Sequence, residues 1–530
     1  MTNRLHALEA EGQAVWLDFL DRRFLAEGGL TRLIEQNGVT GITSNPSIFE
    51  KAIGHGRDYD TEIAALLDQG QPTVSQIYEH LAITDIQAAA DALRPDYDRL
   101  DGADGFASIE VSPFLSRSTQ GTIDEARRLW AAVDRPNLMV KVPGTAEGVP
   151  AVRALTAEGI NVNITLLFAV DMYQAVADAL IAGLEDRVAR GEDISRISSV
   201  ASFFVSRIDT KIDATINARV KAGDAESEAL AALRGKVAIA NAKLAYQYYL
   251  ELTASDRWEA LTAKGARSQR LLWASTGTKD PAYSDVLYVE TLIGRDTINT
   301  MPLKTIEAFL DHGVTSQSLT ADSDGERQVL SRAERLGLDL AGVTNALIIE
   351  GIEKFAEAID ALYAAIAKTR CELLGKRING LETSLPAALC DLVDRRLEHA
   401  RADRWPRRLW AGDATLWTSA DESHWLGWLA AGRGERVDLQ DLVSFAAEAR
   451  SYKDVVLLGM GGSSLGAEVI SRVLGSAPDH PALHVLDSSD PDQIRTVTAT
   501  INLASTLFIV SSKSGSTMEP ELLRGYFFEL

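Results

Sequence analysis

Cysteine, positive charge and long apolar runs are all scarce in this chain. Of its 530 residues only Cys371 and Cys390 are cysteines, too few for a zinc-ribbon pattern or a dense disulfide framework. Acidic residues outnumber basic ones 75 to 53, a net charge of −22 that argues against a nucleic-acid-binding surface. No apolar run approaches the ~20 residues that cross a bilayer, and the start, MTNRLHALEAEGQ, is too polar for a secretory signal. We therefore expect a cytoplasmic protein without nucleic-acid or membrane partners.

The first two thirds of the chain predict a closed (β/α)8 barrel, the TIM barrel. The composition is that of a globular protein, 46% hydrophobic and 24% charged, and the length predicts two large domains or roughly three to four smaller ones. Short apolar runs alternate with stretches of helical pattern, which favours parallel strands joined by helical crossovers. Eight such units fit the barrel. The predicted strands are Val15–Leu20, Gly41–Ser47, Phe106–Ser112, Leu138–Gly144, Ile160–Phe168, Ser198–Ile208, Leu271–Thr276 and Asp296–Pro302.

The intervals between these runs predict the helices. Asp171–Arg190 and Ser227–Glu251 each read as one helix, and Gly54–Asp96 reads as extra helices inserted after the second strand. Leu347–Ala367 has apolar residues at helical spacing and predicts a terminal helix, whereas Thr315–Arg327 is polar and predicts a loop.

The last third has a different character and predicts a second, doubly wound α/β domain. Three strand-like runs follow a Trp-rich segment, and the first and third each meet a Gly/Ser loop and then a helix. A sheet of three strands leaves a face and an edge uncovered, so we expect the second domain to be incomplete as given. The runs are Val455–Met460, Leu483–Asp487 and Thr506–Ser512. The predicted organisation is a barrel in 1–370, a helical lead-in in 371–435 and a partial domain in 436–530.

Five tryptophans crowd the lead-in between the two predicted domains. They are Trp405, Trp410, Trp417, Trp425 and Trp428. Aromatic side chains this dense are more often buried packing area than a cofactor platform. We therefore expect them to pack in the core or under a lid of the second domain.

Lys141 is the strongest candidate for chemistry in the barrel. It lies inside the apolar run LMVKVPG, where desolvation forces an ammonium either to find a partner or to shift towards the neutral amine. A neutral amine is the nucleophile that forms a Schiff base with a carbonyl substrate. Taken alone, Lys141 could equally extend its ammonium from the strand end to solvent or pair with a carboxylate.

The neighbouring runs also carry polar groups near their carboxyl ends, where barrel enzymes place their active sites. Any one of them could be a satisfied core residue, but polar groups on seven of eight strands would be costly without a shared site. Besides Lys141, they are Asp18, Thr43, Ser44, Asn45, Glu110, Asn163, Thr165, Ser202, Arg207 and Ser275.

The first ~370 residues resemble transaldolase, a class I aldolase-type transferase with a (β/α)8 barrel. The segments that carry the resemblance, in order, are WLDFLDR, GITSNPSIF, IEVSP, MVKVPGTAEG, NVNITLLF, ASFFVSRID and WASTGTKDP. The resemblance implies that Lys141 forms the imine, that Asp18 is the acid/base of carbon–carbon cleavage, and that Glu110 works through a water. It also implies that Asn45 and Thr165 orient the intermediate and that water.

The activity implied is transfer of a dihydroxyacetone unit between sugar phosphates in the pentose phosphate pathway. The iminium is the electron sink, so neither a metal nor a cofactor is needed. Arg207, Ser275 and Lys279 are the expected phosphate ligands, and Thr43, Ser44, Asn163 and Ser202 the other substrate-binding residues. Some transaldolases have an arginine close after the serine of the seventh strand, where this chain has Lys279; a lysine offers a point charge without the bidentate fork.

The second domain contains two loops suited to phosphate. The first, GMGGSSLG, fits neither the dinucleotide-binding spacing nor a Walker A motif, and the second, SSKSGST, opens a helix as an anion nest. Together they resemble the first sugar-isomerase (SIS-type) half of glucose-6-phosphate isomerase. The resemblance places Gly462 and Ser463 against the sugar and Ser512, Lys513, Ser514 and Thr517 around its phosphate. The base and the ring-opening histidine of that family would come from later segments, so isomerase activity is expected only with them.

Three functions remain open at this point. The leading one is a transaldolase fused to part of an isomerase, with sugar phosphates as its partners and an undetermined oligomeric state. A lyase that releases dihydroxyacetone from fructose 6-phosphate would share the barrel and the lysine. A non-catalytic sugar-phosphate sensor is disfavoured because the chain offers no basic helix-turn-helix.

Overall fold

The computed structural model describes residues 3–321, 323–375, 385–432, 439–475, 477 and 479–530. The chain divides into two compact units, Met1–Arg404 and Trp405–Leu530. Each unit is described by itself below. No helix in the described ranges is long and apolar enough to cross a membrane.

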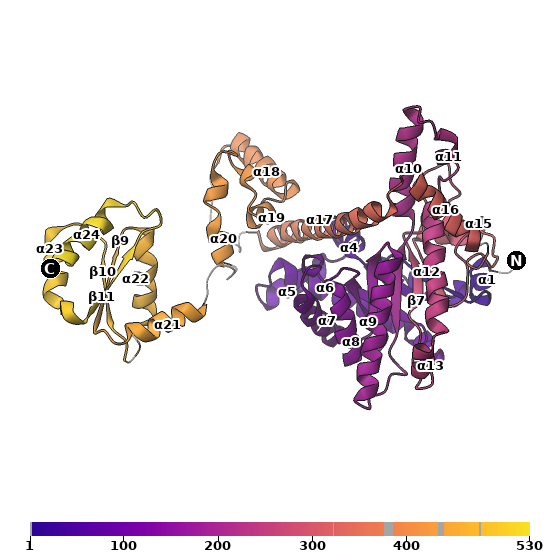
Figure 1. Ribbon diagram of the computed structural model, residues 1–530, viewed down its shortest axis with the longest axis horizontal. Coiled ribbons are helices and arrows are strands. Elements are labelled where there is room, and N and C mark those ends of the chain that lie inside the picture. The colour runs from indigo at the N-terminus through magenta and orange to yellow at the C-terminus, as the bar shows by residue number, and fades with distance from the viewer. Residues whose placement is uncertain (1–2, 322, 376–384, 433–438, 476, 478) are drawn as a thin grey trace. The chain divides into compact units, whose positions relative to one another are not determined.

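The first unit contains the predicted barrel. Eight parallel strands pair in chain order and close between β8 and β1; in Figure 1 this unit runs from indigo at the N-terminus through magenta, with helices in front of the strands. The strands are β1 (Gln13–Leu17), β2 (Val39–Thr43), β3 (Phe106–Glu110), β4 (Leu138–Pro143), β5 (Val162–Leu167), β6 (Ser199–Phe204), β7 (Arg270–Ala274) and β8 (Thr297–Met301). Every residue of β4, β5 and β6 is buried, as expected for parallel strands covered on both faces. The prediction of a (β/α)8 barrel is confirmed.

The helices of this unit surround the barrel and cover its carboxyl end, apart from the last, which has no buried residue and packs against the long helix before it. They are α1 (Arg4–Ala10), α2 (Arg22–Ala26), α3 (Gly29–Asn37), α4 (Pro46–Gly54), α5 (Asp60–Gln69), α6 (Val74–Arg99), α7 (Thr119–Val133), α8 (Gly148–Glu158), α9 (Val170–Ala189), α10 (Ser206–Lys221), α11 (Ser227–Ala231), α12 (Val237–Thr253), α13 (Asp256–Thr262), α14 (Leu287–Glu290), α15 (Leu303–His312), α16 (Ser323–Arg335), α17 (Leu340–Leu374) and α18 (Ala387–Ala402). The extra helices expected after the second strand are α5 and α6. The long α17 packs against α4, α5, α6 and α10 and touches β5, so it lies over the strand ends that carry the polar groups.

Two helix predictions need correction. The stretch Ser227–Glu251 is not one helix, because Gly235 adopts a left-handed conformation (φ +68°) between α11 and α12. The amide of Ala238, in the first turn of α12, instead donates to the Asp209 carboxylate at 2.8 Å, which supplies the partner that a helix start lacks.

The predicted loop Thr315–Arg327 is also wrong at its end, since α16 begins at Ser323. Its first turn carries Asp324 and Glu326, whose charge favours a helix N-terminus. Glu326 further pairs with Lys243 of α12 at 2.7 Å. The polar composition of this segment therefore predicted a loop where a surface helix begins.

The second unit contains a parallel three-stranded sheet with the order β10-β9-β11. Its elements are α19 (Trp405–Trp410), α20 (Gly427–Gly432), α21 (Leu439–Ala449), β9 (Asp454–Gly459), α22 (Gly462–Leu474), β10 (Ala482–Leu486), α23 (Pro491–Thr500), β11 (Thr506–Ser511) and α24 (Met518–Glu529). A central β9 with its successors on either side is the doubly wound arrangement, which confirms the prediction. The buried core of this unit is small: Val456, Leu458, Leu486, Leu523 and Phe527.

The tryptophans of the lead-in are not buried as expected. Trp410, Trp417, Trp425 and Trp428 are each about half exposed, between 48% and 56%. The Trp410 and Trp428 rings pack against each other edge to face with centroids 6.2 Å apart. The small core of the second unit is built from its sheet and α24, and none of these tryptophans belongs to it.

Gly105, just before β3, supports a stability prediction. It has φ +93°, and an added Cβ would lie 2.5 Å from the backbone nitrogen of Tyr97. We expect Gly105→Ala to lower the free energy of unfolding by about 2–4 kcal/mol, because left-handed strain and a backbone clash add together. Gly191→Ala is the control, since Gly191 (φ +73°) has nothing within 4 Å and should cost only ~1–2 kcal/mol of strain. Equal shifts of the two urea midpoints would contradict the clash argument.

Candidate active site

The side chain of Lys141 lies among buried groups at the carboxyl end of the barrel. Its Nζ donates to the carbonyl of Ser44 at 3.0 Å and lies 3.2 Å from Glu110 Oε2. Strand register brings the pair together, because Glu110 of β3 is opposite Lys141 of β4. Only 5% of Lys141 is exposed. Of the alternatives that the sequence left open, the structure therefore favours a lysine paired with a carboxylate over one that extends to solvent.

Burial affects the two carboxylates of this region, Glu110 and Asp18. Burial raises the pKa of Glu110, while the positive charge of Lys141 opposes that rise. Burial likewise raises the pKa of Asp18, opposed first by the charge of Lys141 and then by a hydrogen bond. Both carboxyls are therefore protonated more readily than free ones, which suits them to accept and return protons beside the amine.

The hydrogen bond to Asp18 comes from the neighbouring strand. Thr43 at the end of β2 donates to Asp18 Oδ1 at 3.1 Å, and its hydroxyl also lies 3.1 Å from that of Thr300 in β8. Three successive strands of the closed barrel therefore fix one carboxylate. Thr300 was missed by the sequence analysis, although it interrupts the eighth apolar run as the other candidates interrupt theirs.

Asn163 and Ser44 are fully buried next to the lysine. Asn163 donates to Ser108 Oγ at 3.2 Å and accepts from Ser202 Oγ at 2.7 Å. The Ser44 hydroxyl donates to the Ser108 carbonyl at 2.8 Å. These bonds tie β2, β3, β5 and β6 together below the site.

Thr165 occupies a distorted part of β5. The register of β5 against β6 shifts after Ile164, and Leu166 has a left-handed φ of +61°. The buried Thr165 hydroxyl has no hydrogen-bond partner among the described residues, yet it lines the cavity. A strained backbone beside an unpartnered hydroxyl is typical of a functional position.

Asn45 has a structural task as well as a place in the cavity lining. Its side-chain oxygen accepts from the amide of Ile48 at 3.0 Å and caps the N-terminus of α4. Its nitrogen remains available to a ligand, because an amide side chain has both donor and acceptor capacity.

Three groups from the sixth and seventh strand ends meet at one side of the cavity. The guanidinium carbon of Arg207 lies 5.1 Å from the centre of the Phe204 ring. Burial lowers the pKa of Arg207, and the negative charge of Asp18 opposes this shift. Ser275 has φ +57°, and its hydroxyl is 3.0 Å from that of Ser206. Lys279 lies on the loop beyond and is exposed.

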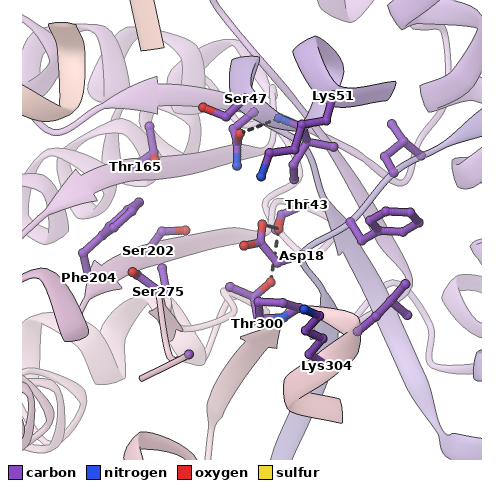
Figure 2. Close-up of a pocket in the computed structure, with 18 of the residues that line it drawn as sticks. Asp18, Thr43, Ser47, Lys51, Thr165, Ser202, Phe204, Ser275, Thr300 and Lys304 are labelled. Carbon is purple, nitrogen blue, oxygen red and sulfur yellow. Dashed lines mark hydrogen bonds between the residues drawn. The ribbon is translucent and has the colours of Figure 1, made fainter. Parts of the chain in front are cut away.

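These residues line a cavity of about 780 Å³ at the carboxyl ends of the strands. In Figure 2, Asp18, Thr43 and Thr300 lie on one side, facing Thr165, Ser202, Phe204 and Ser275. The predicted site residues in the lining are Asp18, Thr43, Asn45, Lys141, Thr165, Ser202, Arg207, Ser275 and Lys279. Glu110, Ser44 and Asn163 are not in it. Lining residues that the sequence analysis missed include Ser47, Lys51, Phe204, Thr300, Lys304 and Phe355; those on helices carry no strand-end signal.

In the second unit, the two predicted phosphate loops lie side by side. Gly459 of β9 is opposite Ser511 of β11, so the segments that follow leave the sheet from the same edge. Gly462 and Ser463 begin α22. In the other loop the Thr517 hydroxyl is 3.0 Å from that of Ser512 and 3.4 Å from that of Ser514, and Lys513 Nζ lies 4.6 Å from the centre of the Trp425 ring.

A buried lysine at a barrel strand end, with two carboxylates close by, is the arrangement expected of a (β/α)8 enzyme that uses an amine as its nucleophile. The chain belongs to the transaldolase/fructose-6-phosphate aldolase family, whose model matches residues 15–366. The non-catalytic sensor is therefore set aside for the barrel.

Several curated relatives match the barrel over nearly their whole length. Transaldolase of Trichodesmium erythraeum (strain IMS101) is 47% identical over 366 residues, which are 68% of this chain and 96% of the relative. Transaldolase 2 of Nostoc punctiforme (strain ATCC 29133 / PCC 73102) is 50% identical with the same coverage. Transaldolase of Thiobacillus denitrificans (strain ATCC 25259 / T1) is 50% identical over 67% of this chain and 97% of its own.

The second unit matches a different family. The phosphoglucose isomerase model matches residues 439–523. The chain thus joins a transaldolase-family barrel to a phosphoglucose isomerase segment, as the two sequence resemblances predicted. Both families act on sugar phosphates.

The position of Arg207 leads to a binding prediction. We expect Arg207→Met to weaken binding of fructose 6-phosphate by about 10- to 100-fold, because a charged hydrogen bond contributes ~1.5–3 kcal/mol. Lys211→Met is the control: Lys211 lies one helical turn further along α10 and pairs with Glu350. Calorimetric titration of both variants, made in a Lys141→Met background to prevent turnover, measures the effect. Equal affinities would remove Arg207 from the phosphate site.

Proposed function

We propose that the barrel is a transaldolase that carries a dihydroxyacetone unit on Lys141 from a ketose phosphate to an aldose phosphate. The observation that carries this proposal is the Lys141–Glu110 pair, with 3.2 Å between Nζ and Oε2 and both side chains under 10% exposed. An amine nucleophile with an adjacent proton acceptor is what imine formation requires.

The first step is attack of the Lys141 amine on the ketose carbonyl. Glu110 takes a proton from the Lys141 ammonium, which frees the amine lone pair. The carbinolamine that forms then receives a proton on its hydroxyl from Glu110 and loses water, leaving a protonated imine. The unpartnered Thr165 hydroxyl is available to hold this water.

The second step is cleavage of the bond between carbons 3 and 4. Asp18 removes the proton of the carbon-4 hydroxyl, the aldose leaves, and the electron pair enters the iminium to give an enamine on Lys141. An elevated pKa suits Asp18 to this task, since a base is most effective when its pKa is near the working pH. The reverse of these steps joins the three-carbon unit to a new aldose. The chain's own groups supply every proton and the electron sink, so the route needs neither a metal nor a cofactor.

Arg207, Ser275 and Lys279 form the proposed phosphate site. Two cations and a hydroxyl on one side of the cavity match the donors that a phosphate accepts. Thr43, Asn45 and Ser202 line the space between them and the lysine and are the proposed partners of the sugar hydroxyls. Ser44 and Asn163 lie one layer deeper, and we propose that they hold this arrangement in place.

A lyase is the second candidate, because the matching family model covers fructose-6-phosphate aldolase as well as transaldolase. The two reactions share every step up to the enamine. They differ in whether the enamine is protonated and hydrolysed or attacks an aldose.

In the second unit, we propose a sugar-phosphate site at the loops of Gly462, Ser463 and Ser512–Thr517. Support comes from their shared edge of the sheet and from the hydroxyls gathered there. We also propose that the protein works in the cytoplasm, where the sugar phosphates of central metabolism are found.

The function is tested by trapping the intermediate and identifying its product. Borohydride added with fructose 6-phosphate should leave a three-carbon adduct on the Lys141 peptide, and Lys141→Met should lose nearly all activity because the covalent route is gone. With erythrose 4-phosphate present, sedoheptulose 7-phosphate should exceed free dihydroxyacetone. An adduct on another lysine would overturn the assignment, and mainly free dihydroxyacetone would establish the lyase. Lys211→Met is the matched control, expected to form the adduct normally.

Thr43 gives a pH prediction for Asp18. Its hydrogen bond favours the ionised carboxylate and lowers the pKa of Asp18, so Thr43→Val should raise that pKa further. The acid limb of the kcat/KM profile should therefore move to higher pH by about one unit. Thr40→Val is the control, because Thr40 lies at the other end of β2 and bonds to Asp104. An unshifted limb in a folded Thr43→Val protein would show that Asp18 does not set it.

A further inference from the structure

A second cavity lies behind Glu110, between β3 and the helices that cover it. It has a volume of about 230 Å³ and is lined by the end of β3 and by residues of α6, α7 and α17. Its lining includes Glu110, Tyr78, Glu125, Arg128 and Tyr363, and we call it the rear cavity. Glu110 is not in the lining of the main cavity, but its Oε2 is 3.2 Å from Lys141 Nζ. The carboxylate thus lies between the lysine and the rear cavity.

The rear cavity has a mixed polar and apolar lining that includes residues at the surface. Ser75 is exposed, and half of the Arg128 side chain is exposed. Arg128 pairs with Glu79 and lies 3.6 Å from Glu125. Glu110 is the buried acid of the lining, with a side chain only 7% exposed. The lining therefore runs from solvent to the proposed proton carrier.

Two tyrosines, Tyr78 and Tyr363, also line the rear cavity. The Tyr78 and Tyr363 rings pack edge to face with centroids 5.9 Å apart, and Tyr78 also packs against Phe49. Burial, Tyr363 and the charge of Glu110 all raise the pKa of Tyr78, and burial raises that of Tyr363 to about 12. Both hydroxyls are therefore neutral near pH 7 and can donate and accept hydrogen bonds. A cavity of this volume has room for several waters, since one needs only ~10–15 Å³ of such space, and its hydroxyl and charged groups offer them hydrogen-bond partners.

The proposed reaction releases one water and consumes one, and the main cavity is a poor route for either. Imine formation converts the ketose carbonyl oxygen into one water, and release of the product ketose consumes one. At both moments the sugar phosphate occupies the main cavity, which is also the entrance for the aldose. Water leaving on that side would have to pass the bound substrate.

We propose that the rear cavity is the route by which the water of imine formation and hydrolysis exchanges with solvent at Glu110. This inference rests on the proposed function. The ketose oxygen leaves as water when the carbon–nitrogen bond forms, passes Glu110 and is diluted by solvent. The oxygen of the product carbonyl then comes from solvent water.

The test follows the ketose oxygen. Fructose 6-phosphate carrying 18O at carbon 2 is mixed with enzyme, and label loss is measured by mass spectrometry on quenched samples, with the enzyme-free exchange subtracted. Ala82 lines the rear cavity and is buried, so Ala82→Leu should fill part of it. Label loss should slow by about tenfold, equivalent to ~1.4 kcal/mol of barrier, while the amount of imine trapped by borohydride stays at the wild-type level. A general disturbance of the site would lower both.

Tyr78→Phe removes one hydroxyl, keeps the ring contacts and should slow label loss in the same direction. It decides the matter if Ala82→Leu fails to fold. Controls outside the rear cavity are Ala341→Leu, at an exposed position that lines a different cavity beside α16, and Tyr248→Phe on α12. Wild-type label loss in folded rear-cavity variants would overturn this inference and leave the transaldolase proposal intact. Failure of wild-type enzyme to form the Lys141 adduct would overturn the proposed function instead.

Discussion

The arrangement of the active site depends on keeping one ammonium and one carboxylate together inside the barrel. Lys141 and Glu110 are both nearly inaccessible and lie 3.2 Å apart. Leaving either one buried without the other would cost several kcal/mol. The groups around them compensate for this burial: the Ser44 carbonyl accepts from the lysine, and the interior bonds of Asn163 hold the strands that carry the pair. The chemistry and the stability of this region therefore rest on the same contacts.

Asp18 shows how the closed sheet distributes a single task over several strands. The carboxylate follows β1, its hydrogen-bond donor ends β2, and the hydroxyl that orients this donor is on β8. β8 is far from β1 and β2 in sequence and lies beside β1 only because the barrel closes. The second unit lacks this closure, and its loops at Gly462 and Ser512 instead depend on β9 being the middle strand of an open sheet.

The sequence predicted the barrel and most of its site because strand-end polarity is a local pattern. Lys141 and Thr165 interrupt apolar runs, and such interruptions are visible without coordinates. Residues on covering helices, such as Phe355 of α17 and Lys51 of α4, follow no such pattern, because whether they reach the cavity depends on how those helices pack. The break at Gly235 and the start of α16 were missed because long-range partners, Asp209 and Lys243, decide where those helices begin. The exposed tryptophans were misjudged because composition does not reveal how large a core is available.

The register between β3 and β4 also limits how the chain can vary. Side chains alternate between the two faces of a strand, so a shift of one residue would replace Glu110 by Ile109 or Val111 beside the lysine. The helix between these strands, α7, has no such constraint, since its length does not enter the pairing. Insertions and deletions should therefore be tolerated in the connections of this barrel and eliminated from its strands, which makes the connections the natural place to graft new specificity.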